Sequence, residues 1–196
     1  RRAPAGAVRA PHDLAVMRMR LLLAISDSLD RIIGVAGKAA AWLLVVNTIV
    51  ICFDVVTRKF GFQLPGLGST RLQELEWQLH TAIFAFWLGL TYIRNGHVRI
   101  DILSSRLSRR SQLVVELIGC VLFAVPYTLL LLYGGWDFFE RSWMQNESSD
   151  APTGLPARYV IKFVLFLGIV LLALSIVSVM CRRLAELLTP AAPEQR

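Results

Sequence analysis

Residues 163–181, FVLFLGIVLLALSIVSVMC, form an apolar run without a single acidic or basic side chain. The hydrocarbon core of a membrane is about 30 Å thick, and a helix needs about 20 apolar residues to cross it. We therefore expect a transmembrane helix here, and three earlier blocks of the chain have a similar character. The four predicted crossings span about residues 34–56, 77–93, 113–136 and 159–181. The sequence thus predicts an all-α membrane protein with four transmembrane helices.

The composition supports this fold class and leaves little room for a further domain. Of the 196 residues, 55% are hydrophobic and 18% are charged, whereas soluble domains carry about 25% charged residues. Nearly all of the chain between Gly34 and Cys181 is needed to cross the membrane or to turn at its surfaces. We expect residues 34–181 to form the four-helix membrane domain, and we expect no soluble enzyme.

The basic residues indicate how the helices are oriented. Lys and Arg number seven in residues 1–38, five in 94–112 and three after Cys181, against three each in 57–73 and 134–162. Cytoplasmic loops of membrane proteins are enriched in Lys and Arg. The N-terminus, the middle loop and the C-terminus are therefore predicted to lie inside the cell. The net charge of +7 thus favours contact with membrane lipids and gives no reason to expect nucleic acid.

Two segments outside the crossings have the spacing of amphipathic helices at the inner membrane surface. Residues 1–33 are expected to form a cytoplasmic tail followed by such a helix, with an apolar line from Leu14 to Ile32. The alternative is a simple N-terminal extension of the first crossing, and the sequence does not separate the two. Residues 100–110 place isoleucine and leucine on one side and arginines on the other. Residues 182–196 are expected to form a cytoplasmic tail.

The residue types that membrane enzymes and electron carriers need do not occur in the required combinations. Cys52, Cys120 and Cys181 lie in or beside three different apolar blocks, and no CxxC pair occurs. Only one of the three histidines, His80, lies at membrane depth, whereas a haem with two histidine ligands needs a facing pair. We therefore expect no catalytic residue, no metal site and no cofactor in this chain.

A few polar and small side chains within the crossings are expected to face other helices. Glu76 and His80 are four residues apart on one side of the second crossing, and Glu116 lies one turn into the third. Ionisable groups in a membrane are costly and often functional, so a proton relay through Glu76 and His80 is one hypothesis. We prefer the alternative, in which Glu76 lies at the headgroup level and His80 hydrogen-bonds a partner helix. Gly37 and Ala41 are expected to mark a packing face.

Two details concern helix geometry, and one hypothesis follows from the polar groups. Pro126 lies near the middle of the third crossing and should kink it. Asp54 and Arg58 are four residues apart in the order that favours an ion pair, and we interpret them as a solvated pair at a helix end.

Polar groups on faces that would otherwise meet lipid are best explained by a covering protein. We therefore hypothesise that the chain is one subunit of a membrane complex.

Three stretches carry a resemblance to a known family. Residues 74–103, ELEWQLHTAIFAFWLGLTYIRNGHVRIDIL, combine a Glu-led helix with a Gly-His-Val-Arg-Ile-Asp turn. Residues 107–119, LSRRSQLVVELIG, enter the third helix, and residues 147–174, ESSDAPTGLPARYVIKFVLFLGIVLLAL, place a Leu-Pro turn and Lys162 before the last. These stretches resemble the DctQ-like small membrane subunits of tripartite ATP-independent periplasmic (TRAP) transporters, and the likeness covers about residues 30–184.

The resemblance implies a three-part secondary transporter in the bacterial inner membrane. A periplasmic binding protein would deliver a substrate, usually an organic acid, to a large elevator-type membrane subunit that holds the sodium sites. The small subunit would brace the large one. The positions that match the family pattern as structural or subunit-interface residues are Glu76, His80, Gly89, Gly96, His97, Arg99, Asp101, Pro156 and Lys162. The candidates for contact with the binding protein are Trp143, Glu147 and Asp150.

Three alternative functions make different demands on the sequence. The small subunit of a tripartite tricarboxylate transporter predicts the same topology but accounts less well for the turn at residues 96–101. A stand-alone membrane enzyme or redox protein needs facing histidines, a cysteine pair or an acidic metal motif. An autonomous channel or proton carrier needs a continuous polar face on the second and third crossings, which the sequence lacks.

Overall fold

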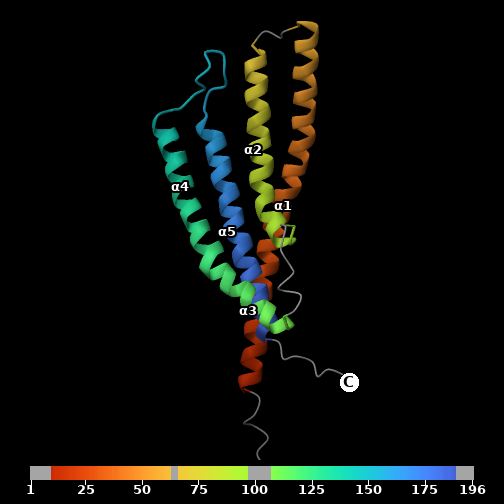
Figure 1. Cartoon of the computed structure of the whole chain (residues 1–196), viewed down its shortest axis with the longest axis vertical. Helices are drawn as coiled ribbons and strands as arrows, with labels where there is room; N and C mark the ends of the chain where they lie inside the picture. The colour runs from red at the N-terminus through yellow and green to blue at the C-terminus, as the bar shows by residue number, and fades with distance from the viewer. Residues whose placement is uncertain (1–9, 63–65, 97–106, 189–196) are drawn as a thin grey trace, which may run out of the picture.

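The computed structural model describes residues 10–62, 66–96 and 107–188, and all the regular elements among them are helices. The elements are α1 (Ala10–Phe60), α2 (Ser69–Ile93), α3 (Arg109–Gly119), the π-helical turn η2 (Cys120–Ala124), α4 (Val125–Met144) and α5 (Tyr159–Leu188). α5 packs against α1, α2 and α4, and α2 also packs against α1. The long helices therefore lie side by side in the order α4, α5, α2, α1 (Figure 1).

Three stretches of helix are long and apolar enough to cross a membrane. They span Val16–Phe60, Arg109–Met144 and Tyr159–Leu188 and contain the first, third and fourth predicted crossings. α2 is not among these three, and polar Gln78, His80 and Thr81 interrupt its apolar sequence. The structure thus confirms an all-α protein with apolar helices of membrane-spanning length, and the fourth crossing stays a prediction.

The N-terminal third of α1 continues the first crossing without a break. α1 is one helix of 51 residues, so the structure shows the extension and not a separate surface helix in residues 10–33. Ser26 and Ile33 are fully buried, because α1 packs against α5 over this stretch. The apolar line from Leu14 to Ile32 lies on a different side of α1 from Ser26 and Ile33, and its residues are largely exposed. The other expected surface helix, at 100–110, lies mostly outside the described residues.

The buried face of α1 repeats every seven residues. Five residues spaced by seven are each at most 3% exposed: Ser26, Ile33, Ala40, Asn47 and Asp54. A strict seven-residue repeat is typical of helices that supercoil around a neighbour with a left-handed twist. Ala41, which we expected on the packing face, is exposed. The next buried residue after Gly37 is Ala40, three positions later. Buried positions in such a repeat are separated alternately by three and four residues.

Close contact between the helices depends on glycines. A Cβ atom on Gly89 would lie 2.9 Å from the carbonyl oxygen of Leu171, and one on Gly168 would lie 2.6 Å from the Cβ of Ala85. α2 and α5 therefore touch almost backbone to backbone, as small residues allow in membrane helices. On the other side of α2, a Cβ on Gly37 would lie 2.5 Å from Leu90.

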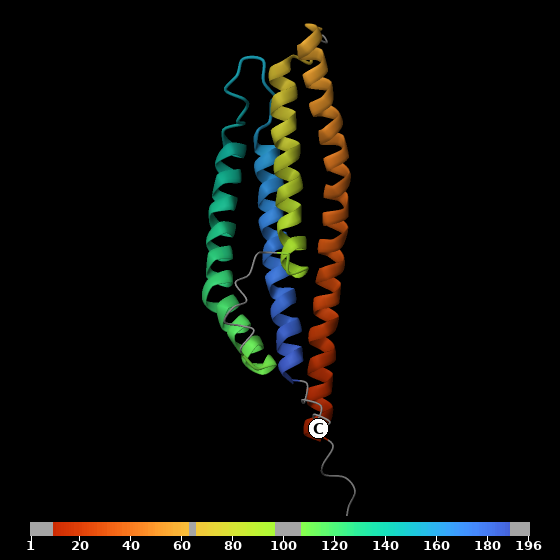
Figure 2. The ribbon, with the colours of Figure 1, turned by 45° about the vertical axis from the view of Figure 1, so that its right-hand side comes forward.

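The third rod, made of α3, η2 and α4, bends near its N-terminal end, which is predicted to be the inner one. The two views show α3 turned away from the line of α4 (Figures 1 and 2). η2 ends at Ala124, and Pro126 follows within the first turn of α4. A π-helical turn and a proline are both recognised causes of a bend. The structure thus confirms the expected bend and places it at η2, just before Pro126.

Candidate functional site

The loop between α4 and α5, predicted to lie outside the cell, is tied to the start of α2 by Glu74. The backbone N–H of Leu155 donates to Glu74 Oε2 at 2.5 Å, and the hydroxyl of Ser149 donates to Oε1. These two hydrogen bonds hold the pKa of Glu74 below its usual value of 4.5. A Cβ on Gly154 would collide with Ser149 Oγ at 2.2 Å. The loop is therefore a built structure that fits closely against α2.

Glu147 is the centre of a second set of contacts in the same loop. Its carboxylate forms an ion pair with Lys162, and its backbone carbonyl accepts from the backbone N–H of Arg158 at 2.8 Å. Arg158 also pairs with Asp150 at 3.0 Å. The hydrogen bond and the positive charge of Lys162 lower the pKa of Glu147. The structure thus brings together three of the residues singled out in the sequence, Glu147, Asp150 and Lys162.

Aromatic rings surround this charged set. Lys162 Nζ lies 4.0 Å from the centre of the Phe138 ring, which is a cation–π contact. Trp143 packs edge-on against Tyr159 with 4.9 Å between ring centres, and 58% of its surface is exposed. Pro156 is also exposed. The outer end therefore presents charge and aromatic surface together.

At the opposite end of the helices, α1 and α5 are joined by a buried polar cluster. The Ser178 hydroxyl donates to Asp30 Oδ1 at 2.5 Å and lies 2.9 Å from Ser26 Oγ. Arg182 donates to the other oxygen of Asp30 at 2.5 Å, and its contact with Asp27 is longer, at 3.5 Å. Ser26 and Ser178 are at most 1% exposed. Each polar group in this cluster thus has a partner, as burial requires.

Arg183, which follows Arg182 in α5, connects α5 to the third rod through ion pairs. Arg183 Nε lies 2.7 Å from Glu116 Oε2, and Arg183 also pairs with Glu186 at 3.2 Å. Arg109 of α3 reaches the same Glu186 at 2.6 Å. Consecutive residues of a helix point about 100° apart, which explains how Arg182 and Arg183 bind different neighbours.

Glu76 and His80 have separate surroundings in the part of the chain that the structure describes. Glu76 Oε1 is buried without a hydrogen-bond partner there. His80 is exposed and has a ring contact with Phe84, with 6.4 Å between centres. Asn47 Oδ1 of α1 is a second buried oxygen without a partner among these residues. No hydrogen bond or ion pair joins Glu76 to His80 among the described residues, so the relay stays a hypothesis without structural support.

The remaining matched positions fall into two groups. Gly89 lies at the tight contact of α2 with α5. Gly96 follows the end of α2, where its N–H donates to the carbonyl of Thr91 at 2.9 Å. His97, Arg99 and Asp101 lie outside the described residues, so the turn that is most specific to the resemblance has no structural description.

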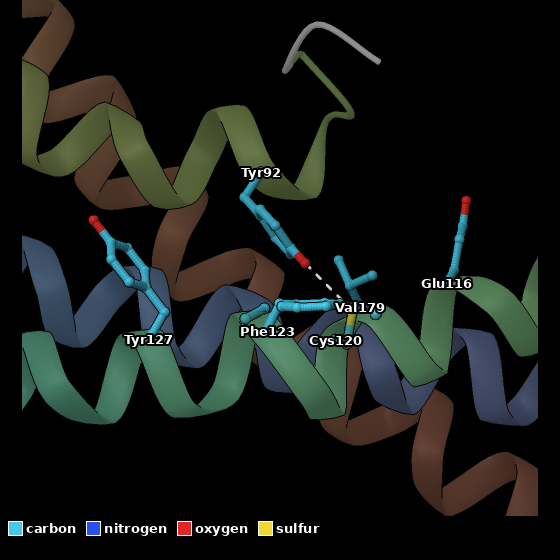
Figure 3. Close-up of a pocket in the computed structure, with 8 residues that line it drawn as sticks. Tyr92, Glu116, Cys120, Phe123, Tyr127 and Val179 are labelled. Carbon is cyan, nitrogen blue, oxygen red and sulfur yellow. Dashed lines mark hydrogen bonds between the residues drawn. The ribbon is translucent and has the colours of Figure 1, made fainter. Parts of the chain in front are cut away.

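A hollow of about 530 Å³ opens between α2 and the third rod near the inner end. In Figure 3, Tyr92 points down from α2, and its hydroxyl lies 3.4 Å from Cys120 Sγ. Phe123 and Tyr127 project from the third rod, and Val179 of α5 lies beside Phe123 in this view. The lining is largely apolar, so the hollow suits another apolar surface better than a polar substrate.

The sequence interpretation missed the residues that join the helices at the end where α3 lies. It places Ser178 in an apolar run, and Arg182 and Arg183 in a cytoplasmic tail. A signal was present, because two arginines directly after a charge-free helix can reach two neighbours. The acidic partners Asp30 and Glu116 lie far away in sequence, however, and the pairing depends on the packing.

Comparison with family models identifies residues 47–186 with the DctQ component of tripartite ATP-independent periplasmic transporters. The match covers most of the chain and includes α2, the third rod and α5 in full, apart from the last residues of α5. Comparisons with curated proteins and with solved structures gave no match. No group of three or more metal-ligating side chains occurs in the described part of the chain. The apolar helices and the family match agree, and the chain belongs to the DctQ family of TRAP transporter components.

Proposed function

We propose that this chain is the small integral-membrane scaffold subunit of a TRAP transporter. It crosses the bacterial inner membrane four times with both ends in the cytoplasm. It braces a large elevator-type subunit, which performs the sodium-coupled uptake of an organic acid delivered by a periplasmic binding protein. The family match supports the class of component, and the arrangement of charges supports the membrane topology.

The observation that carries the topology is a charge-free interval in each of the four rods. The intervals are 39–53 in α1, 77–93 in α2, 117–136 in the third rod and 163–181 in α5. At 1.5 Å per residue, the last interval is about 28 Å long, close to the thickness of the hydrocarbon core. α2 has the same kind of interval although its average hydropathy is lower, so it counts as the fourth crossing.

Ion pairs gather at both ends of these intervals. Asp54 pairs with Arg58, and Glu147 pairs with Lys162, at the end that carries the outer loop. The pairs of Arg182 with Asp30 and of Arg183 with Glu116 lie at the other end. Paired charges suit the polar boundary of a membrane better than its centre. The excess of basic residues marks the second end as cytoplasmic.

The use of the polar residues supports a scaffold and not a pore. The partly exposed charged groups at the inner end bind one another across α1, α5 and α3, which fixes the helices relative to each other. Between the two ends, the buried faces consist mainly of isoleucine, alanine and glycine. Sodium and substrate sites are therefore assigned to the large subunit, and this chain is assigned a bracing role.

The outer loop is the proposed contact for the binding protein. Glu147 and Asp150 are held in place by Lys162 and Arg158, so the acidic surface is ordered before any partner arrives. Asp150 is 93% exposed, and Trp143 adds apolar area beside it. Ordered, exposed charge favours rapid association with a complementary surface.

Reconstitution tests the proposed function directly. Proteoliposomes are prepared with the large subunit and either this chain or no added subunit, and sodium-driven uptake is measured with the binding protein present. Uptake should require this chain. Transport that is unchanged when the chain is omitted contradicts an essential role, and transport by this chain alone contradicts the scaffold assignment.

A further inference from the structure

Two hollows lie along the seam between α2 and the third rod. The inner one, described above, is lined by Tyr92 of α2 and by Cys120 and Tyr127 of the third rod. The outer one has a volume of about 330 Å³ and is lined by Trp77, Thr81 and Phe138, among others. α5 forms the floor of both through Val179 and Leu165. The seam therefore has a hollow at each end of the membrane-spanning region.

One stripe of the third rod connects the two hollows. Cys120, Tyr127 and Gly134 are spaced by seven residues, and Phe138 follows four residues later. This spacing keeps all four on one side of a helix. A Cβ atom on Gly134 would have no neighbouring atom within 4 Å. The groove between α2 and the third rod is therefore open at this position, between the two hollows. The stripe has the repeat that one helix uses to pack against another.

Tyr127 has a hydroxyl group where lipid offers no hydrogen bond. It lies ten residues from Asp137 and eleven from Glu116, about 15 Å from either charged boundary. The residue is 62% exposed and lines the inner hollow, and no hydrogen bond of its hydroxyl is found among the described residues. In Figure 3 the side chain points from the third rod toward the α2 side of the seam. A polar group left unsatisfied in hydrocarbon is costly, and only protein can supply the partner at this depth.

The outward face of α1 has a different character. Its exposed side chains in the charge-free interval include Trp42 and Ile49, at 75% and 63% exposure. The exposed Thr48 on the same helix donates its hydroxyl to the carbonyl of Leu44 at 2.9 Å, so it needs no outside partner. This face is suited to lipid chains, whereas the seam has an unmet hydrogen bond.

We propose that the seam between α2 and the third rod receives one transmembrane helix of the large subunit. This assignment rests on the proposed function and adds the surface on which the partner binds. The incoming helix packs over Gly134 and presents a hydrogen-bond acceptor, either a backbone carbonyl or a Ser, Thr, Asn or Gln side chain, opposite Tyr127. Interfaces of this type in membranes are built from small residues and a few hydrogen bonds.

Photo-crosslinking in the assembled complex tests the location. A benzophenone amino acid is placed at position 127, 81 or 49 in the chain co-expressed with the large subunit, and adducts are identified by mass spectrometry. Positions 127 and 81 should crosslink to the large subunit, and position 49 on α1 should not. Adducts with the large subunit at 49 alone, or lipid adducts at 127 and 81, overturn the assignment. If the two subunits fail to co-purify even as wild type, the proposed function fails instead.

Substitutions test the energetic role of the seam. Gly134→Leu fills it and should weaken the complex at least tenfold, whereas Gly34→Leu on α1, where added atoms also meet open space, should leave it unchanged. Tyr127→Phe should weaken the complex about threefold to tenfold, the effect of one membrane hydrogen bond. Tyr133→Phe on the same helix is the matched control. Equal effects of both members of either pair, with an unchanged melting temperature of the isolated chain, contradict the proposal.

Discussion

The guanidinium of Arg182, at the end of α5, lies 2.5 Å from the carboxylate of Asp30, which is 152 residues earlier in α1. The same carboxylate accepts the hydroxyl of the buried Ser178. This one acidic side chain therefore connects the first and last helices at the inner end of the protein.

Replacing Asp30 should loosen the contact of α1 with α5. Asp30→Ala removes the acceptor of both Ser178 and Arg182, and we expect a loss of about 1–3 kcal/mol in the free energy of unfolding. The lower end of this range reflects the partial exposure of Arg182, where solvent weakens an ion pair. Thermal unfolding of the detergent-solubilised protein, followed by the fluorescence of its five tryptophans, measures the change. Asp27→Ala is the control, because Asp27 is 71% exposed and 3.5 Å from Arg182. Equal losses in the two variants would show that net charge and not this contact is responsible.

Adding a methyl group at Gly168 should separate α2 from α5. The new Cβ would lie 2.6 Å from the Cβ of Ala85 and 2.7 Å from its carbonyl oxygen, so the backbones must move apart. Overpacking of this kind costs about 1–3 kcal/mol, and the melting temperature of Gly168→Ala should fall accordingly. Gly34→Ala, where the added atom meets open space, should be neutral or slightly stabilising. A Gly168→Ala protein as stable as wild type would contradict the close approach of the two helices.

The ion pair of Glu147 with Lys162 should make stability depend on pH in the acid range. The pKa of Glu147 is lowered in the folded protein chiefly by the hydrogen bond and the positive charge of Lys162. Its contribution to stability is therefore fully present above the unfolded value of about 4.5 and is lost as the pH falls through the lower folded pKa. Melting temperatures measured between about pH 6 and pH 3 should fall less steeply for Glu147→Gln than for wild type. Glu140→Gln changes an exposed carboxylate of α4 and should keep the wild-type profile. If the melting temperatures of Glu147→Gln and wild type fell equally with pH, the ion pair of Glu147 with Lys162 would not contribute to the pH dependence of stability.

The proposed topology predicts which single cysteines a membrane-impermeant maleimide can reach in intact cells. With the three native cysteines replaced by alanine, Asp150→Cys should be labelled from outside. Arg109→Cys should be labelled after the membrane is opened. Asp150 and Arg109 are both exposed in the structure, so a difference between them reports the side of the membrane. Labelling of both positions in intact cells would contradict a membrane crossing between them, and labelling of Arg109→Cys alone would contradict the proposed orientation.

The sequence predicted the helices better than the contacts between them. Hydropathy located α5 and the apolar part of α1 because crossing the membrane requires a long uncharged run, and this requirement is local. Glu147 and Lys162 were identified through the resemblance, and the structure places them in one ion pair. The partners of Arg182 and Arg183 depend on how helices distant in sequence pack, so local patterns do not determine them. The continuous α1 was one of two open alternatives, because an amphipathic line has the same spacing whether it faces lipid headgroups or another helix.

The seven-residue repeat of α1 has a consequence for how this helix can move. A rotation of α1 about its axis by one residue position would turn the buried stripe by about 100°. Such a turn would carry Asn47 out of the interface and into hydrocarbon, and it would separate Ser26 from Ser178 at the inner end. Partial displacements are therefore penalised at several heights at once, and the surrounding lipid opposes each of them. α1 is fixed against rotation by the membrane as much as by its neighbours, so it can transmit force between the two sides only as a rigid unit.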